Sequence, residues 1–245
     1  MPKEISAMEV FLLYSMDMKV TSLNLAGYKN WSERESNIVS YLEATDSDVV
    51  FLQEVKFNIE YSPFTQSRYI NSLLPTPYPH SQSSVSRIFE SSGSESREGL
   101  AVLSKYPITN SEIMVLKKRA DDKHTRIIQK VSLLVDGQII NFTNVHFSNN
   151  DYSDEQLEET LSITKSRGEN SVILGDFNIF DIQAVSDLYS DDYHASTDFY
   201  QYVSFPSENV TLDYVLVPRE YGFTSLSIGE NLSDHNALTF ELSVR

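Results

Sequence analysis

The sequence predicts a mixed α/β fold in which two mixed β-sheets pack face to face and helices lie outside them. Apolar runs of strand length alternate along the chain with segments of helical periodicity. Asp136-Gly137, between two such runs, is typical of a tight β-hairpin. Crossovers and hairpins in one chain indicate mixed sheets packed on each other and covered by helices.

The first half of the chain contains two expected strands, two expected helices and a long loop. The strands are at residues 19–27 and 48–55, and the helices at residues 31–46 and 62–74. Ser32 and Glu35 have the spacing of a capping box at the start of the first helix. Residues 75–97 are rich in Pro and Ser and predict a long mobile loop. Its Ser-rich part, from Ser81 to Arg97, either shapes substrate access or is only a surface loop.

The second half alternates strands with two further helices. Strands are expected at residues 99–108, 125–135, 138–148, 171–177, 211–218 and 235–244, and helices at residues 153–168 and 181–189. Nothing resembling a linker interrupts this series, so we expect one domain over residues 18–245. Residues 1–17 are interpreted as an N-terminal extension of uncertain order.

Composition limits the classes of function. The formal net charge is -16, which does not favour non-specific binding to nucleic acid, because phosphate backbones are held mainly by Lys and Arg. The chain has no cysteine, which excludes disulfides, thiolate metal sites and a cysteine nucleophile. The N-terminus lacks the pattern of a signal peptide and no apolar run is long enough to span a membrane, so a cytoplasmic location is the default prediction.

Polar side chains stand at the ends of many of the expected strands. In a mixed sheet such ends can meet at one edge, which would bring carboxylates, amides and histidines together. The residues concerned are Asn24, Glu54, Glu98, His146, Asp176, Asn178, Asp213, Asp234 and His235. The segment around Asp176 and Asn178, "GDFN", would read as an ordinary turn if it stood alone.

Such a group of side chains favours a divalent metal site. Crowded carboxylates raise one another's pKa unless a cation lies among them, and oxygen ligands suit Mg²⁺ or Mn²⁺. Histidines add proton-transfer groups that work near neutral pH. Together these groups indicate hydrolysis of a phosphoester by water, and a bound cation would let an acidic pocket accept an anionic substrate.

The chain also resembles the endonuclease/exonuclease/phosphatase superfamily, which has the fold of deoxyribonuclease I. The similarity runs from about Lys19 to Val244. It is carried by the motifs "SLNLAG", "FLQEV", "EGLAVLSKYPI", "NVHFSN", "GDFN", "LDYVLV" and "SDHNAL". The resemblance implies a four-layer α/β sandwich with the active site between the sheet edges.

The resemblance also implies metal ligands. Glu54 would be the principal ligand of Mg²⁺ or Mn²⁺, with Asn24 and Asp234 supporting the metal directly or through water. Asp176 would orient the attacking water or hold a second metal.

Roles at the phosphate follow in the same way. Asn178 would contact the scissile phosphate, and His235, polarised by Asp213, would help to deprotonate the water. His146, paired with Glu98, would stabilise the phosphate or protonate the leaving oxygen. Arg126 lies where many relatives hold a phosphate-binding arginine, although an exposed arginine in the charged loop "KKRADDKHTR" is an equal alternative.

We therefore expect a metal-dependent phosphoester hydrolase, with a phosphodiesterase favoured. The histidine in "NVHFSN" differs from the tyrosine motif of abasic-site endonucleases, and secreted deoxyribonucleases carry disulfides that this chain lacks. Small phosphoesters, lipid phosphoesters and nucleic-acid ends are the candidate substrates. A DNA or RNA nuclease is the first alternative, and a non-catalytic binding module on the same fold is the alternative of another class.

Overall fold

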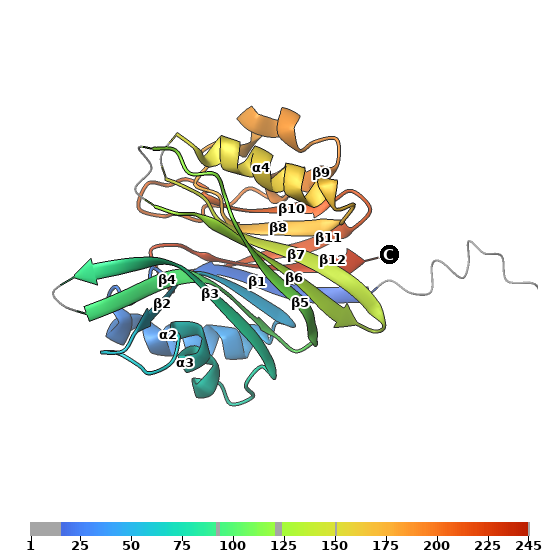
Figure 1. The fold of residues 1–245 in the computed structure, drawn as a ribbon. Coiled ribbons are helices and arrows are strands. Elements are labelled where there is room, and N and C mark those ends of the chain that lie inside the picture. Colours follow the sequence, from blue (N-terminus) through green and yellow to red (C-terminus); the bar gives the residue numbers. More distant parts are fainter. Residues whose placement is uncertain (1–15, 92–93, 121–123, 150, 245) are drawn as a thin grey trace, which may run out of the picture.

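The computed structural model describes residues 16–91, 94–120, 124–149 and 151–244. Two β-sheets pack face to face, α2 and α3 cover the outer face of one sheet, and α4 covers the outer face of the other (Figure 1). Over these residues the chain forms the expected four-layer α/β sandwich of two mixed six-stranded sheets.

The first sheet has the strand order β11-β12-β1-β2-β4-β3 within the described residues. Its strands are β1 (Met16–Asn24), β2 (Val49–Asn58), β3 (His80–Ser91), β4 (Ser94–Ser104), β11 (Gly222–Gly229) and β12 (Ala237–Val244). β1 and β2 run parallel and are joined through helix α2, whereas the other neighbours are antiparallel. The ends of β1 and β2 therefore meet the start of β12 at one edge of the sandwich.

The second sheet has the order β5-β6-β7-β8-β10-β9 in the described part of the chain. Its strands are β5 (Ile108–Val115), β6 (Ile127–Val135), β7 (Gln138–His146), β8 (Ser171–Asp176), β9 (Tyr193–Ala195) and β10 (Asp213–Pro218). Asp136-Gly137 joins β6 to β7, which confirms the predicted hairpin. β7 and β8 run parallel through helix α4 (Ser153–Ser166), so their ends lie together.

Three apolar layers hold the sheets and helices together. The central layer joins the inner faces of the two sheets, where the rings of Phe51 and Phe142 lie 5.1 Å apart between centroids. A second layer packs α2 (Trp31–Thr45) and α3 (Gln66–Leu73) on the first sheet through residues such as Ile38 and Ile70. The third packs α4 and the 3-10 helix η1 (Ile182–Leu188) on the second sheet. Burial of this apolar surface is the main force that fixes the strand ends in space.

Several sequence predictions need correction. Most of the segment predicted as a mobile loop forms the β3–β4 hairpin, whose inner edge pairs with β2 and whose far end extends beyond the other strands (Figure 1). The predicted capping box is absent, because α2 begins at Trp31 and Glu35 accepts a hydrogen bond from the Trp31 indole at 2.7 Å instead. α3 begins only at Gln66, capped by Thr65 rather than at Ser62. β1 begins at Met16, and residues 1–15 lie outside the described residues.

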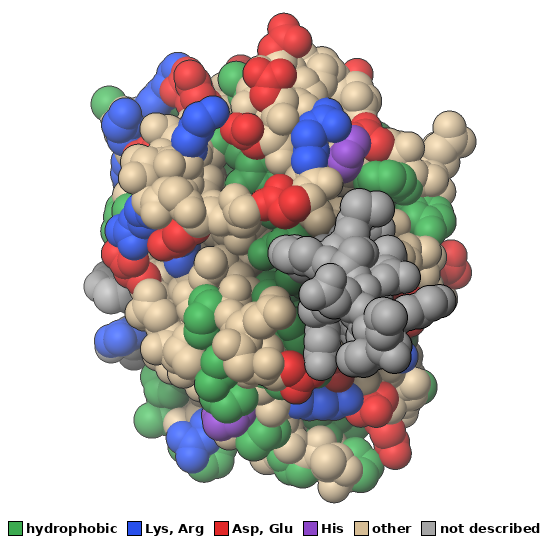
Figure 2. Space-filling model, turned by 90° about the vertical axis from the view of Figure 1, so that its right-hand side faces the viewer, with side chains coloured by type: hydrophobic (Ala, Val, Ile, Leu, Met, Phe, Trp, Pro, Cys, Tyr) green, Lys and Arg blue, Asp and Glu red, His purple; other side chains and the backbone are tan. Residues whose placement is uncertain are grey.

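The surface carries acidic and basic side chains of both signs close together. Figure 2, viewed from the side on which the C-terminus lies, shows Lys and Arg side chains among Asp and Glu side chains rather than in one broad basic patch. Within the described residues, no helix has both the length and the apolar character needed to cross a membrane.

Candidate active site

Asn24 and Glu54 reach the edge of the first sheet from neighbouring parallel strands. Asn24 ends β1, and its strand pairs with β2 up to Gln53. Beyond Leu52 the pairing of β2 with β4 shifts register, which marks a β-bulge. Glu54 lies in this bulge with a φ of 50°, a left-handed conformation that is uncommon for a residue other than glycine. Because of the bulge, the Glu54 side chain departs from the regular alternation of side chains between the two faces of the strand.

His146 and Asp176 lie opposite each other at the ends of β7 and β8 in the second sheet. The preceding residue of β8, Gly175, has a φ of 133°, and a Cβ atom there would lie 2.2 Å from the carbonyl oxygen of Val145. Only glycine therefore allows β8 to approach β7 this closely. Through this close contact Gly175 helps to place Asp176 at the edge of the sheet.

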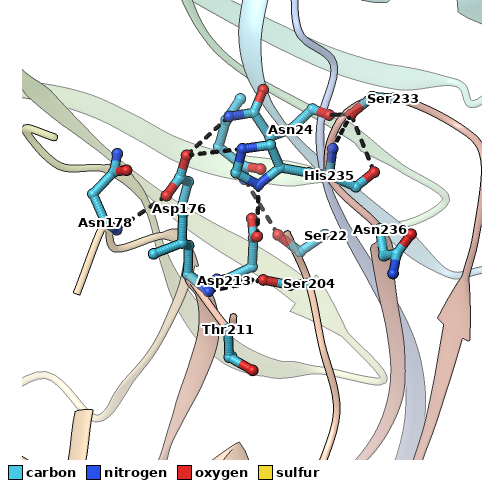
Figure 3. Close-up of polar contacts among 12 residues, drawn as sticks. Ser22, Asn24, Asp176, Asn178, Ser204, Thr211, Asp213, Ser233, His235 and Asn236 are labelled. Carbon is cyan, nitrogen blue, oxygen red and sulfur yellow. Dashed lines mark hydrogen bonds and ion pairs between the residues drawn. The ribbon is translucent and has the colours of Figure 1, made fainter. Parts of the chain in front are cut away.

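Asp213 and His235 form a close, buried pair in the site. Asp213 begins β10 opposite Asp176, and His235 lies in the turn before β12. Their side chains are buried, and the distance from His235 Nδ1 to Asp213 Oδ2 is 2.7 Å. This contact fixes the ring so that its Nε2 atom faces Asp176, at 3.8 Å from Oδ2 (Figure 3).

Asp176 is the centre of the arrangement. Its Oδ2 atom accepts a hydrogen bond from the Asn24 amide at 2.9 Å and lies 3.5 Å from His146 Nε2. The same Asn24 amide is 3.4 Å from Glu54 Oε1, which is itself 3.9 Å from His146 Nε2. Side chains from both sheets therefore converge around the Asp176 carboxylate.

Burial and like charge shift the pKa values of these groups. Burial, followed by repulsion from Asp213, raises the pKa of Asp176 from 3.8 to about 7. Burial, followed by repulsion from Glu98, also raises the pKa of Glu54. Burial alone would lower the pKa of His235, but attraction and hydrogen bonding to Asp213 outweigh it and raise the pKa to about 10. Without a bound cation, His235 is therefore protonated at neutral pH.

The remaining predicted residues surround this centre at different depths. Glu98 forms an ion pair with Lys56, at 2.6 Å between Nζ and Oε2, and lines a small depression with His146 and Arg126. Arg126 is buried, which excludes the exposed-arginine alternative. Asp234 is more open: its side chain is 34% exposed and pairs with Lys29 at 3.0 Å.

Asn178 lies beside Asp176 but is held by the backbone. Its side-chain amide donates to the Phe147 carbonyl at 3.0 Å. Its backbone N–H donates to Asp176 Oδ1 at 3.0 Å (Figure 3). Asn178 has a φ of 51°, so the segment "GDFN" is a turn as well as part of the site.

Sequence reasoning missed residues that hold the loops of the site together. The guanidinium of Arg34 donates to the carbonyls of Leu25 and Leu232, at 2.9 and 3.0 Å, and also to those of Gly27 and Lys29. Ser233 adds a 2.6 Å hydrogen bond to the Asn24 carbonyl. These contacts join the loop after β1 to the loop before His235. No motif signals Arg34, because its partners are backbone carbonyls, which carry no residue-specific signal, and one of them, that of Leu232, is 198 residues away.

The donor set fits a hard divalent cation. Asp176, Asp213 and His235 offer ligand atoms that all lie within 4.8 Å of one another, so this buried group could hold a metal. The carboxylate of Glu54 lies beside them, and its pKa is raised. A bound cation would lower this pKa again, because positive charge favours the ionised form of a carboxyl group. Asn24 presents its amide nitrogen to the carboxylates because its oxygen accepts a hydrogen bond from the Ala26 N–H at 2.9 Å.

A sandwich of two mixed sheets, with carboxylates and histidines from both at one edge, defines the class of deoxyribonuclease I-like proteins. Within this class the chain belongs to the endonuclease/exonuclease/phosphatase family, whose sequence model matches residues 21–235. The superfamily includes metal-dependent phosphoesterases and nucleases.

Solved structures share the fold at low sequence identity. An endonuclease/exonuclease/phosphatase from Beutenbergia cavernae is 20% identical, with a TM-score of 0.73 over 93% of this chain and 72% of its own. The catalytic domain of human Nocturnin is 17% identical, with a TM-score of 0.70 over 94% of each chain. A mannosyl-6-phosphatase from Bacteroides thetaiotaomicron is 16% identical, with a TM-score of 0.70 over 92% of this chain and 99% of its own. Comparison with curated protein sequences found no match.

Proposed function

We propose that this protein is a hydrolase that uses Mg²⁺ or Mn²⁺ to cleave a phosphodiester with water. The observation that carries the proposal is the convergence on Asp176 of Glu54, Asn24 and two histidines from both sheets. Family membership supports the phosphoester class. A structural role alone does not account for a buried carboxylate whose pKa is raised to about 7 with other acids beside it.

Asp176 and Asp213, from the group whose ligand atoms lie within 4.8 Å of one another, would hold the cation together with the neighbouring carboxylate of Glu54. Asn24 keeps the carboxylates of Glu54 and Asp176 in place through its amide. Asp234 would act through water, because its carboxylate is bound to Lys29. When bound, the cation supplies positive charge that stabilises the phosphate oxygens and increases the acidity of nearby water.

The two histidines would handle the protons. His235 Nδ1 faces Asp213, which leaves Nε2 directed at the space beside Asp176 where an attacking water would lie. Positive charge nearby would lower the pKa of His235 from about 10 and let Nε2 accept a proton. His146, together with Arg126 in the adjoining depression, is placed to stabilise the phosphate or protonate the leaving oxygen. Asn178 is the remaining candidate contact to the phosphate.

A diester of small or lipid type is favoured over long duplex nucleic acid, because a formal charge of -16 opposes non-specific binding to a phosphate backbone. A nuclease acting on nucleic-acid ends is the second candidate. The neighbours named above include both a mannosyl-6-phosphatase and the Nocturnin catalytic domain, so the fold accommodates more than one activity.

Two aryl esters test the proposal. Bis-p-nitrophenyl phosphate and p-nitrophenyl phosphate are incubated with the protein and Mg²⁺, Mn²⁺ or EDTA. Asp176→Ala is the test variant. Asp191→Ala is its matched control, because Asp191 is exposed and lies near the Pro218 end of β10, away from Asp213.

Diester cleavage that requires metal and is lost only in Asp176→Ala supports the proposal. Cleavage of the monoester alone would replace it with a phosphatase. If neither ester nor an oligonucleotide or phospholipid panel is cleaved with either metal, the binding-module alternative takes its place.

A further inference from the structure

A fully buried amide crosses from one sheet to the other behind the site. Asn144 lies on β7, and none of its surface is exposed. Its amide nitrogen is within 3.2 Å of two carbonyl oxygens of the opposite sheet, those of Leu52 on β2 and Ala101 on β4. Its oxygen accepts a hydrogen bond from the Gln53 amide at 2.7 Å. Its amide nitrogen also lies 3.3 Å from Oε1 of Gln129, so Asn144 joins the buried polar side chains of Gln53 and Gln129 between the two sheets. Buried polar groups of this kind are retained where their hydrogen bonds fix a particular geometry.

The two carbonyls mark the place where the first sheet departs from regular pairing. Leu52 and Ala101 form the last regular pair before the bulge, and regular pairing resumes at Val55. Glu54 lies between, in its left-handed conformation. Asn144 therefore contacts the last regular pair before the bulge. The same side-chain amide group also holds Gln53, the residue before Glu54.

The strand that carries Asn144 also carries a residue of the site. Asn144 and His146 are two residues apart on β7, so their side chains leave the same face of the strand. His146 Nε2 lies 3.9 Å from Glu54 Oε1. A shift of the bulge relative to β7 would change this distance first.

We propose that Asn144 is a positioning residue that fixes the bulge of β2 and thereby sets Glu54 against His146 and Asp176. This inference rests on the proposed function for its effect on turnover, but the structural part concerns the chain alone. Second-layer groups that orient a metal ligand typically contribute roughly 10- to 100-fold to activity or metal affinity.

The test compares Asn144→Leu with Thr143→Val. Leucine has the same number of side-chain heavy atoms as asparagine, with the same branching at Cγ, but it is bulkier and cannot donate to the two carbonyls. Thr143 is the matched control, because it is equally buried on the same strand, points to the opposite face and loses only a 2.8 Å hydrogen bond to Ser171. If Asn144→Leu does not fold, Asn144→Ser takes its place, because serine is too short to reach both carbonyls.

The first readout is amide hydrogen exchange in the metal-free proteins. We expect exchange over residues 53–55 to be on the order of 10-fold faster in Asn144→Leu and unchanged in Thr143→Val. Equal exchange at these residues in both variants would overturn the proposal whether or not the protein hydrolyses a phosphoester.

The second readout is the Kd for Mn²⁺ by calorimetry, with kcat and KM where turnover is found. Asn144→Leu should weaken Mn²⁺ binding or lower kcat by roughly 10- to 100-fold, with Thr143→Val close to the unsubstituted protein. If Mn²⁺ binding and kcat both match those of Thr143→Val, Asn144 does not position Glu54. A lack of turnover in the unsubstituted protein would instead count against the proposed function.

Discussion

Replacing Asp176 by asparagine should stabilise the metal-free fold while removing activity. Asp176 is buried at the centre of the site, with the acids Asp213 and Glu54 contributing to its raised pKa. Asparagine has nearly the same shape but no charge. The substitution therefore removes an unfavourable buried charge and leaves the packing of β8 unchanged.

The magnitude follows from the pKa of Asp176, which rises from 3.8 to about 7 on folding. A shift of one unit in pKa corresponds to roughly 1.4 kcal/mol of free energy. Ionised Asp176 therefore lowers the free energy of unfolding by at most about 4 kcal/mol at pH 8. Asparagine loses one acceptor, for either the Asn24 amide or the Asn178 N–H, which costs about 1–2 kcal/mol. A net gain of about 1–3 kcal/mol remains at pH 8.

The sign of the pH dependence is fixed by the direction of the shift. The folded chain binds the Asp176 proton more tightly than the unfolded chain does, so this group's contribution to stability falls as the pH rises from about 4 to about 7. Asp176→Asn lacks this fall. The difference in unfolding free energy between variant and unsubstituted protein should be about 2–3 kcal/mol larger at pH 8 than at pH 5.

Urea unfolding in EDTA at pH 5 and pH 8 measures this difference, and Asp191→Asn is the control for loss of an exposed carboxylate. A second series with Mn²⁺ should stabilise the unsubstituted protein more than Asp176→Asn. The reasoning is refuted if Asp176→Asn is less stable than the unsubstituted protein by the same amount at both pH values.

Three further predictions concern the parts around Asp176. Asp213→Asn should lower the pKa of His235, seen by NMR titration, by roughly two units and lower kcat by roughly 10²- to 10⁴-fold; an unchanged pKa would contradict the pairing. Gly175→Ala should lower the free energy of unfolding, measured in urea, by about 3 kcal/mol or more, because the new Cβ would meet the Val145 carbonyl. Gly168→Ala, which has open space around it, should lower it by only about 1 kcal/mol, and equal losses would refute the close-contact argument. Arg34→Lys should lower the free energy of unfolding by about 2–4 kcal/mol and weaken Mn²⁺ binding, because one ammonium cannot reach the four carbonyls that the guanidinium holds. A loss no larger than that of the surface variant Arg68→Lys would show that these four hydrogen bonds are dispensable.

The strands that sequence reasoning found and those it missed differ in position within the sheets. The strands found lie mainly inside the sheets, where near-continuous burial produces apolar runs such as that of β8. The four strands that were missed, β3, β5, β9 and β11, are the outermost strands of the two sheets. Edge strands are paired on one side only and carry polar residues, so β5 and β11 alternate weakly and the Ser-rich β3 resembles a loop.

The candidate site was predictable to a similar depth. Strand ends are visible in the sequence, and Asn24, Glu54, His146, Asp176, Asp213 and His235 do meet at one edge. The residues that form ion pairs with the predicted site residues were harder to predict than the site residues themselves. Glu98 pairs with Lys56 and Asp234 with Lys29, and neither lysine belongs to a motif. Such contacts depend on loop geometry, which hydrophobic periodicity does not encode.

The register between the two sheets is the part that no strand-end pattern contains. Residues of the first sheet and of the second sheet reach the same space only if one sheet is fixed against the other to within about an ångström, and apolar packing alone tolerates sliding. Directional hydrogen bonds across the central layer remove that freedom, and the amide of Asn144 makes them at the bulge that carries Glu54. On the face of β7 that carries Ile140 and Phe142 of the central layer, Asn144 takes the next position, two residues before His146. A polar residue at an inward-facing position was therefore the available sequence signal. A chain that kept every strand-end residue of this site but lost such a crossing amide would keep the composition of the site and lose its geometry.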